Sequence, residues 1–302
     1  MSAVELDAGL SLEAGTGGLW REAWRRLMHN PGAVAGFCLV GSFIVLAIFA
    51  PAIAPYDPRA QNLFLIAKGC CPGPSARHLL GVDPLGRDEL SRIIYGARFS
   101  LLIGIVAVSV GMTIGIVLGS LAGFIGGAVD AVIMRAMDIM LAIPGLLLAI
   151  GIVAMLGPGL FQVMIAVGIA NVPIFARLLR GSILGLRESD FVLAARSVGV
   201  PRRRILTVHV LPNAVSPLIV QGTLALATAI IDVAGLGFLG LGPQDPSTPE
   251  WGTMLTQVDR YLQSAPFLAI VPGVAIVLSV LGFNLIGDGL REALDPKLRG
   301  RV

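Results

Sequence analysis

Long apolar runs alternate with short polar segments along most of the chain. Six runs approach the length of about 20 residues that an α-helix needs to cross a bilayer. They cover approximately residues 33–50, 100–124, 132–156, 160–176, 214–239 and 266–286. Only Gly157, Pro158 and Gly159 separate the third run from the fourth, which predicts a tight helical hairpin. The pattern predicts an all-α integral membrane protein with six transmembrane helices.

Composition supports this class of protein. The chain has 302 residues, of which 55% are hydrophobic and 14% are charged. Soluble domains carry about 25% charged residues, so a soluble protein is excluded. The chain has a formal net charge of +3, but its basic residues are not interleaved with aromatic ones. We therefore expect no nucleic-acid partner.

The distribution of basic residues predicts which segments face the cytoplasm. If the N-terminus is inside, 15 of the 22 lysines and arginines fall in inner segments. This bias follows the positive-inside rule and places both termini in the cytoplasm. The first basic residue is Arg21, so the first apolar run is predicted to be an uncleaved span rather than a signal peptide.

Four parts follow from these assignments. Residues 1–32 form a cytoplasmic segment that is disordered over 1–18 and then contains an amphipathic helix. Residues 33–98 hold the first transmembrane helix and an outer loop. Residues 99–291 form the core, with five transmembrane helices and an inner loop at 187–213. Residues 292–302 form a cytoplasmic tail.

The outer loop has two features of its own. Asp83 is expected to cap a helix that starts at Pro84 and leads into the second span. Cys70 and Cys71 are adjacent and lie where oxidation is possible. A free, an intermolecular and a bonded state remain open for this pair.

Glycine recurs every fourth residue along the second span. The five positions are Gly111, Gly115, Gly119, Gly123 and Gly127. Residues spaced in this way share one helix face and let another backbone approach closely. We expect a helix-packing seam, although glycine is also generally enriched in membrane helices.

The inner loop contains a polar segment with the pattern of two short helices. Asp190 is expected to cap the first helix, and Gly199 is placed to end it in a left-handed conformation. Pro201 can begin the second helix, which Pro212 is expected to stop. Physical reasoning alone leaves two roles open: docking of a soluble partner, and anchoring of the loop at the membrane surface.

This segment resembles the loop by which permeases of binding-protein-dependent ABC importers contact their ATPases. The family pattern is Glu-Ala-Ala, a glycine four residues later, and an Ile-x-Leu-Pro ending. Ala194, Ala195, Gly199, Leu211 and Pro212 match it, while Leu193 replaces the glutamate. The residues that the resemblance assigns to ATPase coupling are Phe191, Ala194, Ala195, Arg196, Gly199, Arg203, Leu211 and Pro212.

Further stretches are similar to the second permease of dipeptide and oligopeptide importers. They include His78–Asp83, Gly96–Leu101, Gly123–Gly127, Phe238–Gly242 and Leu294–Pro296. The resemblance implies the fold of a type I ABC importer permease with cytoplasmic coupling helices between helices 4 and 5. It implies alternating access for di- or oligopeptides across a bacterial inner membrane, with nickel, glutathione or another small solute as the alternative cargo.

The same resemblance implies a set of partners. They are a homologous second permease, two cytoplasmic ABC ATPases, an extracytoplasmic solute-binding protein and membrane lipid. The chain has no phosphate-binding G-x-x-x-x-G-K-[ST] motif, no catalytic set and no metal-ligand cluster. We expect an ATP-driven subunit that is not itself an enzyme and binds no cofactor, with ATP and Mg on the ATPases.

Asp232 falls in the last third of the fifth apolar run, toward its outer end. It is expected either to face the pathway or to lie at the outer water boundary. A secondary transporter would carry more intramembrane acids, and a channel would assemble as a symmetric homo-oligomer. Both classes remain weaker alternatives.

Overall fold

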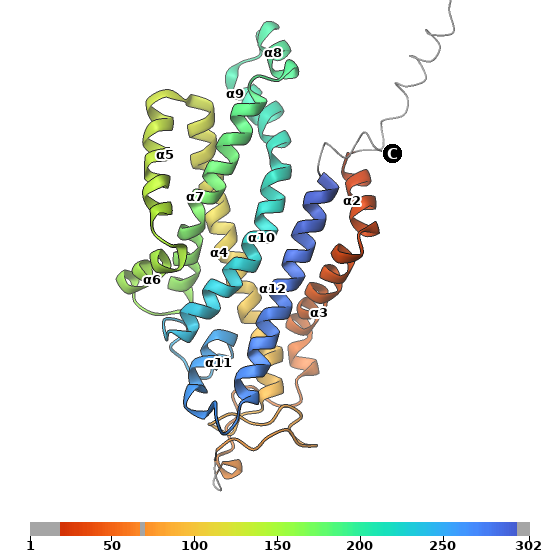
Figure 1. Cartoon of the computed structure of the whole chain (residues 1–302), viewed down its shortest axis with the longest axis vertical. Helices are drawn as coiled ribbons and strands as arrows, with labels where there is room; N and C mark the ends of the chain where they lie inside the picture. Colours follow the sequence, from red (N-terminus) through yellow and green to blue (C-terminus); the bar gives the residue numbers. More distant parts are fainter. Residues whose placement is uncertain (1–18, 67–69, 295–302) are drawn as a thin grey trace, which may run out of the picture.

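The computed structural model describes residues 19–66 and 70–294. Over these residues the protein is an elongated bundle of helices, with one isolated β-bridge between Val82 and Asp88 (Figure 1). The predicted disorder of residues 1–18 and most of the predicted tail lie outside the described residues.

The first two helices are separated by a capped break at Asn30. α2 (Leu19–His29) is amphipathic and leads to α3 (Pro31–Ile53). The side chain of Asn30 accepts a hydrogen bond from the Ala33 N–H at 3.1 Å, and Pro31 occupies the first helical position. This pairing of a cap and a proline starts α3 where its apolar run begins.

Among the described residues, five helical segments are long and apolar enough to cross a membrane. They are α3, α4 (Glu89–Ile125), α7 (Leu160–Leu186), the segment Arg202–Phe238 that ends in α10 (Leu211–Phe238), and α12 (Phe267–Leu294). The shorter elements are η1 (Leu63–Leu65), α8 (Asp190–Ser197), α9 (Arg202–Arg204), η2 (Ile205–Val210), α11 (Trp251–Gln257) and η3 (Asp259–Tyr261).

The third predicted span is a bent pair and not one straight helix. α5 (Gly127–Ala142) and α6 (Gly145–Leu156) meet at an angle of 96°. Ile143 is extended because Pro144 follows it, and proline disfavours the helical conformation of the preceding residue. The predicted hairpin at residues 157–159 is confirmed, since α6 ends at Leu156 and α7 begins at Leu160.

The expected helix start at Asp83 is wrong. Asp83 instead organises a turn, in which its carboxylate accepts hydrogen bonds from the N–H groups of Leu85 and Arg87, each at 2.9 Å. The helix begins at Glu89, five residues later than expected, with Asp88 as its cap, and the Asp88 carboxylate accepts from the Ser91 N–H at 2.8 Å. From there α4 runs without a break through 37 residues.

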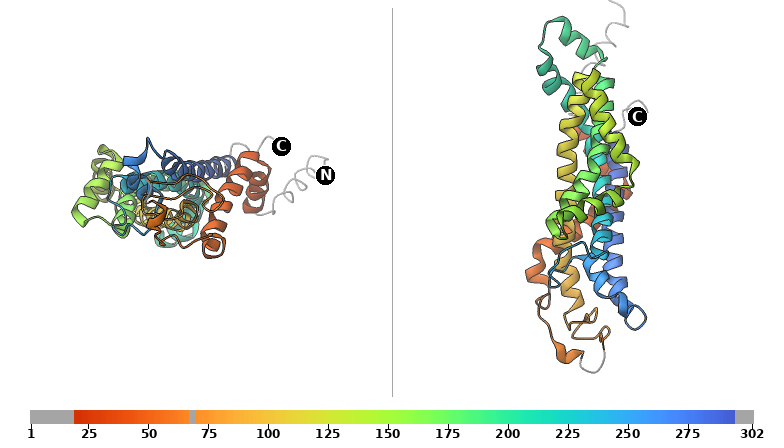
Figure 2. Two further views of the ribbon diagram at one scale, coloured as in Figure 1. Left: turned by 90° about the horizontal axis from the view of Figure 1, so that it is seen from below. Right: turned by 90° about the vertical axis from the view of Figure 1, so that its left-hand side faces the viewer.

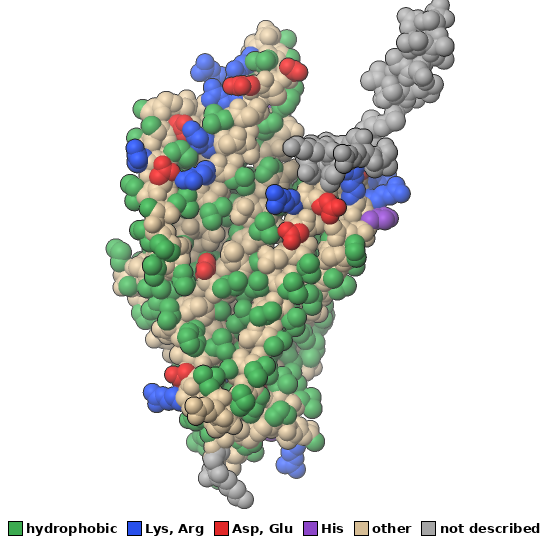
Figure 3. Space-filling model, viewed as in Figure 1, with side chains coloured by type: hydrophobic (Ala, Val, Ile, Leu, Met, Phe, Trp, Pro, Cys, Tyr) green, Lys and Arg blue, Asp and Glu red, His purple; other side chains and the backbone are tan. Residues whose placement is uncertain are grey.

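The two largest groups of buried side chains in the described residues hold most of the bundle together. The larger one joins α4, α6, α7 and α10 and includes Val167, Phe175 and Leu179. The second joins α3, α10, α11 and α12 to the start of α4, with Phe43 against the edge of Trp251. Charged side chains on the visible face lie mainly toward the two ends of the bundle, with an apolar band between them (Figure 3).

Candidate functional site

The predicted coupling segment, residues 187–213 of the inner loop, forms one end of the molecule. α8 and α9 extend past the ends of the long helices, and the loop before α4 lies at the opposite end (Figures 1 and 2). Ser189 occupies the cap position of α8, so the expectation that Asp190 is the cap is wrong by one residue. Asp190 lies in the first turn, where its charge favours the helix N-terminus.

Gly199 ends α8 through a tight hydrogen-bonded turn. Its φ is +77°, in the left-handed region that favours glycine. The N–H of Val200 donates to the Ala195 carbonyl at 3.0 Å, and the N–H of Gly199 donates to the Arg196 carbonyl at 3.0 Å. These two bonds define a Schellman motif, which fixes the direction in which the chain leaves the helix.

The coupling segment is fastened to the main apolar core. Val192, Ile205 and Val210 are at most 2% exposed and belong to the same cluster as the core of α4, α7 and α10. The partly buried Ala195 and Leu211 pack against this cluster. The side chains of the coupling segment are therefore closely packed with those of the long helices.

The expectation that Pro212 stops the second inner helix is wrong. α9 continues through the π-helical turn η2 into α10, so that Arg202–Phe238 forms one span. Pro212 is the second residue of α10 and, within this continuous helical span, has no N–H to donate. The π turn directly before it changes the hydrogen-bond register at that point.

The outward face of α8 is apolar. Phe191, Ala194 and Val198 follow helical spacing and are all exposed, and Val198 is 80% exposed. Leu193, which stands at the position of the family's glutamate, is also exposed, at 47%. Arg196, Arg203 and Pro212 are exposed as well. The sequence pattern puts Val198 on the apolar face of this helix, but Leu193 and Val198 were not among the residues predicted to contact the ATPases, although exposed apolar residues on a polar segment are typical of contact surfaces.

The glycine-rich face of α4 lies against α7. A Cβ atom added at Gly111 would be 2.5 Å from the Gly168 carbonyl oxygen, and one added at Gly119 would be 2.5 Å from the Ala176 carbonyl oxygen. A Cβ atom added at Gly115 would be 2.5 Å from the Phe175 Cβ, and one added at Gly123 would be 3.0 Å from the Ile183 Cβ. The seam does not extend to Gly127, which lies beyond the end of α4 and has no neighbour within 4 Å of such a Cβ.

The bent pair is tied to α7 by two ion pairs. Arg180 binds Asp130 through two hydrogen bonds of 2.5 and 2.6 Å, and Arg177 binds Asp138 at 2.7 Å. The pairing of Asp138 with Arg135, which their spacing of three residues favours, is not formed. Asp232 lies half-buried on α10 and makes no hydrogen bond or ion pair with the described residues.

A buried charged network at the opposite end was missed by sequence reasoning. Arg87 is 1% exposed and binds Asp83 at 2.5 Å, the Pro246 carbonyl at 2.6 Å and the Gln257 side chain at 2.7 Å. Arg92 lies 3.5 Å from the same Asp83 carboxylate. The network joins the loop before α4 to the segment around α11, which are far apart in the sequence.

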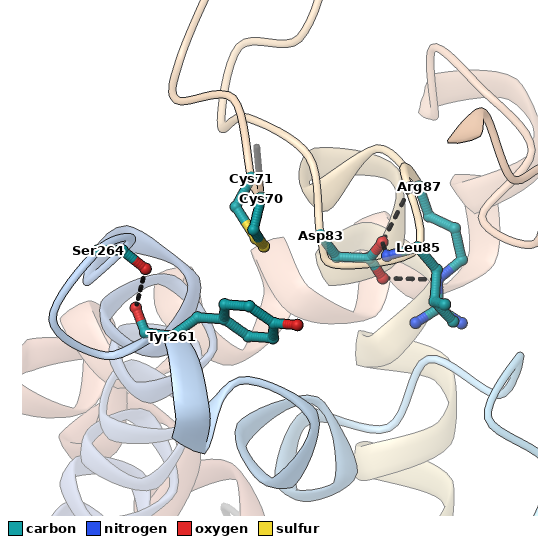
Figure 4. The surroundings of a disulfide bond; sticks show 7 residues. All are labelled: Cys70, Cys71, Asp83, Leu85, Arg87, Tyr261 and Ser264. Carbon is teal, nitrogen blue, oxygen red and sulfur yellow. Dashed lines mark hydrogen bonds and ion pairs between the residues drawn. A yellow bond between two sulfur atoms is a disulfide. The ribbon is translucent and has the colours of Figure 1, made fainter. Parts of the chain in front are cut away.

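Cys70 and Cys71 form a disulfide beside this network. Figure 4 shows it between the turn at Asp83 and the loop that carries Tyr261 and Ser264. Cys71 is buried with Val258, Ala265 and Leu268. The sequence left a free, an intermolecular and a bonded state open, and the structure contains the disulfide between Cys70 and Cys71. Through Cys71 the outer loop packs against the start of α12.

Glu250 caps α11 from a buried position. It is 1% exposed, and its carboxylate accepts from the N–H groups of Gly252 at 2.8 Å and Thr253 at 2.7 Å. Burial raises the pKa of this carboxyl above its ordinary range, while these hydrogen bonds oppose the rise. Within the described residues, no group of three His, Cys, Asp or Glu side chains is placed to hold a metal ion.

Comparisons with known proteins match most of the chain. Residues 115–300 match the family "Binding-protein-dependent transport system inner membrane component", and residues 18–67 match the N-terminal transmembrane domain of oligopeptide transport permease C. The dipeptide transport system permease protein DppC of Alkalihalophilus pseudofirmus is 49% identical over 93% of this chain and 90% of its own length.

Two other relatives are equally similar. The di/tripeptide transport system permease protein DppC of Pseudomonas aeruginosa is 50% identical, over 92% of each chain. The glutathione transport system permease protein GsiD of Shigella flexneri is 51% identical over 93% of this chain and 91% of its own length. A chain of the inward-facing MetNI methionine ABC transporter shares the fold, with a TM-score of 0.57 and 21% identity over 68% of this chain and 96% of its own.

Proposed function

Because this chain belongs to the family of binding-protein-dependent transport system inner membrane components, we propose that it forms half of a translocation pathway for short peptides. Members of the family are permease subunits of ABC importers, in which separate subunits hydrolyse ATP. The chain is accordingly a transport subunit and not an enzyme. The rest of the proposal concerns its cargo, its contact with the ATPases and its orientation.

The cargo is proposed from the names of the relatives. They transport dipeptides, di- and tripeptides, and glutathione, and all are 49–51% identical to this chain over nearly its whole length. Glutathione is itself a tripeptide, so the shared class is the short peptide. Nickel or another small solute is the alternative, because the binding protein makes the first selection.

The exposed apolar face of α8 is the observation that carries the docking proposal. Phe191, Ala194 and Val198 present a hydrophobic stripe at the tip of a segment that is otherwise polar. The Schellman turn at Gly199 and the continuous helix from Arg202 to Phe238 connect this stripe rigidly to a transmembrane helix. ATP-driven closure of two ATPases would then move α8 as a lever and rock the long helices.

The remaining partners and the orientation belong to the same proposal. A homologous second permease would complete the pathway, and an extracytoplasmic binding protein would deliver the peptide. ATP and Mg would bind the two ATPases, and lipid would surround the apolar band. α8 would lie on the cytoplasmic side of a bacterial inner membrane, as would both termini. Asp232 is proposed as a residue of the pathway that can meet a peptide amine.

The docking proposal is tested with Val198→Asp. Full burial of a valine contributes roughly 1.5–3 kcal/mol, so a charge there should weaken ATPase binding about tenfold or more. Leu79→Asp is the matched control, since Leu79 is 62% exposed in the loop at the opposite end. The measurement is ATPase retention by the purified permease pair, followed by peptide uptake in proteoliposomes. Equal ATPase retention by the two variants would contradict docking at α8.

A further inference from the structure

An open cavity lies at the end of the bundle opposite α8 (Figure 1). Its volume is about 770 Å³, within the range of about 300–1,000 Å³ that is usual for small-molecule sites. Residues 51–59, which include the end of α3 and the segment after it, form one wall, and the first turns of α4 form the other. The cavity is therefore separate from the coupling segment and from the docking surface on α8.

The α4 wall combines aromatic side chains with a cation. Tyr95, Phe99 and Leu102 line the cavity at helical spacing, so they share one face of α4. Arg98 lines the same wall, is exposed, and forms no ion pair within the part of the chain that the structure describes. This wall suits a ligand that carries a carboxylate next to an apolar side chain.

The opposite wall is held in place by its own contacts. The Tyr56 hydroxyl donates to the Arg77 carbonyl at 2.9 Å, and the Tyr56 N–H donates to the Ser91 Oγ at 3.1 Å. Three prolines within residues 51–58 restrict the backbone around this tyrosine. Because the wall is ordered before a ligand arrives, binding there costs less conformational entropy.

Charges of both signs line the cavity. Asp57 and Arg59 stand on the proline-containing wall, and both side chains are exposed. Asp57 accepts a hydrogen bond from the Arg59 N–H through Oδ1 at 2.8 Å. The charge of Arg59 also acts on Asp245, whose pKa is lowered first by its hydrogen bonds with Ser247 and further by this charge. Among the described residues, Arg98 therefore remains the cavity cation without an acidic partner.

From this arrangement we propose that the cavity binds a zwitterionic short peptide, with its terminal carboxylate at Arg98 and its ammonium group at Asp57. An apolar side chain of the peptide would lie against Tyr95 and Phe99. A guanidinium fork matches the two oxygens of a carboxylate, whereas a ligand with only negative charge would be repelled by Asp57. The inference rests on the proposed function in taking peptides as the cargo, and it adds which groups of the peptide are recognised.

The role of such a site follows from its position. It lies at the end of the bundle opposite the coupling segment, where the binding protein is proposed to deliver the peptide. The site would hold the released peptide before it enters the pathway. Because both charged contacts go to the ends of the peptide, the site would select for free termini more than for particular side chains.

The test measures binding of alanyl-phenylalanine to the purified full chain in neutral detergent by isothermal titration calorimetry. The C-terminal amide of this peptide lacks the carboxylate, and its N-acetyl form lacks the ammonium group. Arg98→Gln removes a charge-assisted contact, so it should weaken binding of the free peptide about tenfold or more and leave binding of the amide nearly unchanged. Asp57→Asn should likewise weaken binding of the free peptide but not of the N-acetyl form. Arg260→Gln removes an exposed cation outside the cavity and should have little effect.

Combining a change in the peptide with a change in the protein separates a direct contact from a general charge effect. If Arg98 binds the carboxylate, the losses caused by the amide and by Arg98→Gln do not add. Additive losses, an equal loss in Arg260→Gln, or no binding of the free peptide at millimolar concentration would overturn the site. Binding that disappears when the second permease is added would instead assign the cavity to the interface between the two permeases.

Peptide uptake by the assembled importer is measured in parallel. Uptake by the unaltered importer that is unchanged in Arg98→Gln and Asp57→Asn would reject the site and leave the proposed function intact. Absence of peptide uptake by the unaltered importer would reject the proposed function itself.

Discussion

A methyl group added at Gly119 should force α4 and α7 apart. The Cβ of Gly119→Ala would lie 2.5 Å from the Ala176 carbonyl oxygen and 3.1 Å from the Leu179 Cβ. Ordinary C–H···O contacts between packed helices are about 3.3–3.6 Å long, so the oxygen is about 1 Å too close. That oxygen is a backbone atom and cannot move aside as the end of a side chain can. Overpacking of this kind typically costs about 1–3 kcal/mol.

Gly181→Ala provides a matched control on α7. A Cβ at Gly181 has no neighbour within 4 Å, so the substitution should be neutral or improve helix stability by up to about 1 kcal/mol. Thermal unfolding of the two purified variants in the same detergent compares them directly. We expect the midpoint for Gly119→Ala to fall by roughly 2–10 °C, and that for Gly181→Ala to stay or rise. A midpoint for Gly119→Ala at or above that for Gly181→Ala would refute close backbone packing at this seam.

Three further predictions concern other parts of the molecule. Gly199→Leu places a branched side chain at a φ of +77°, which costs roughly 1–2 kcal/mol. The variant should insert normally into the membrane but should take up less peptide per ATP hydrolysed in proteoliposomes. Fully coupled uptake would argue against a rigid lever. Burial raises the pKa of Glu250, so this carboxyl binds a proton more tightly in the folded state than in the unfolded state. Lowering the pH from 8 toward the ordinary pKa of a glutamate carboxyl should therefore stabilise the protein relative to Glu250→Gln. A difference in unfolding midpoint between the two proteins that does not change with pH would contradict this. Single cysteines at Ser197 and Ser264, introduced without the native cysteines, should react with an impermeant maleimide from opposite sides of the membrane, and labelling from one side would overturn the topology.

The sequence predicted features that depend on local periodicity. Apolar run length located the long helices, and the four-residue spacing from Gly111 to Gly123 selected the face of α4 that meets α7. The left-handed end of α8 followed from Gly199 alone, because few other residues adopt that conformation at low cost. Each of these signals lies within one element.

Features that depend on contacts across the bundle were not predicted. Arg135 is closer to Asp138 in the sequence than Arg177 is. Because α5 packs on α7, however, Asp138 forms its ion pair with Arg177. Arg87 and Gln257 meet only because the loop before α4 folds against α11. A proline such as Pro212 commonly ends a helix, yet the π turn before it lets α9 continue into α10. These contacts and this continuation do not follow from the sequence near each residue.

We propose that this chain works as one permease subunit of an ATP-driven peptide importer. The most direct test is gentle affinity purification of the chain from its native membrane, with mass spectrometry of the proteins and small molecules that accompany it. We predict a second six-span permease, two P-loop ATPases and an extracytoplasmic binding protein that carries a short peptide. Recovery of the chain alone, as a stable homo-oligomer that still moves solute after reconstitution, would contradict the claim.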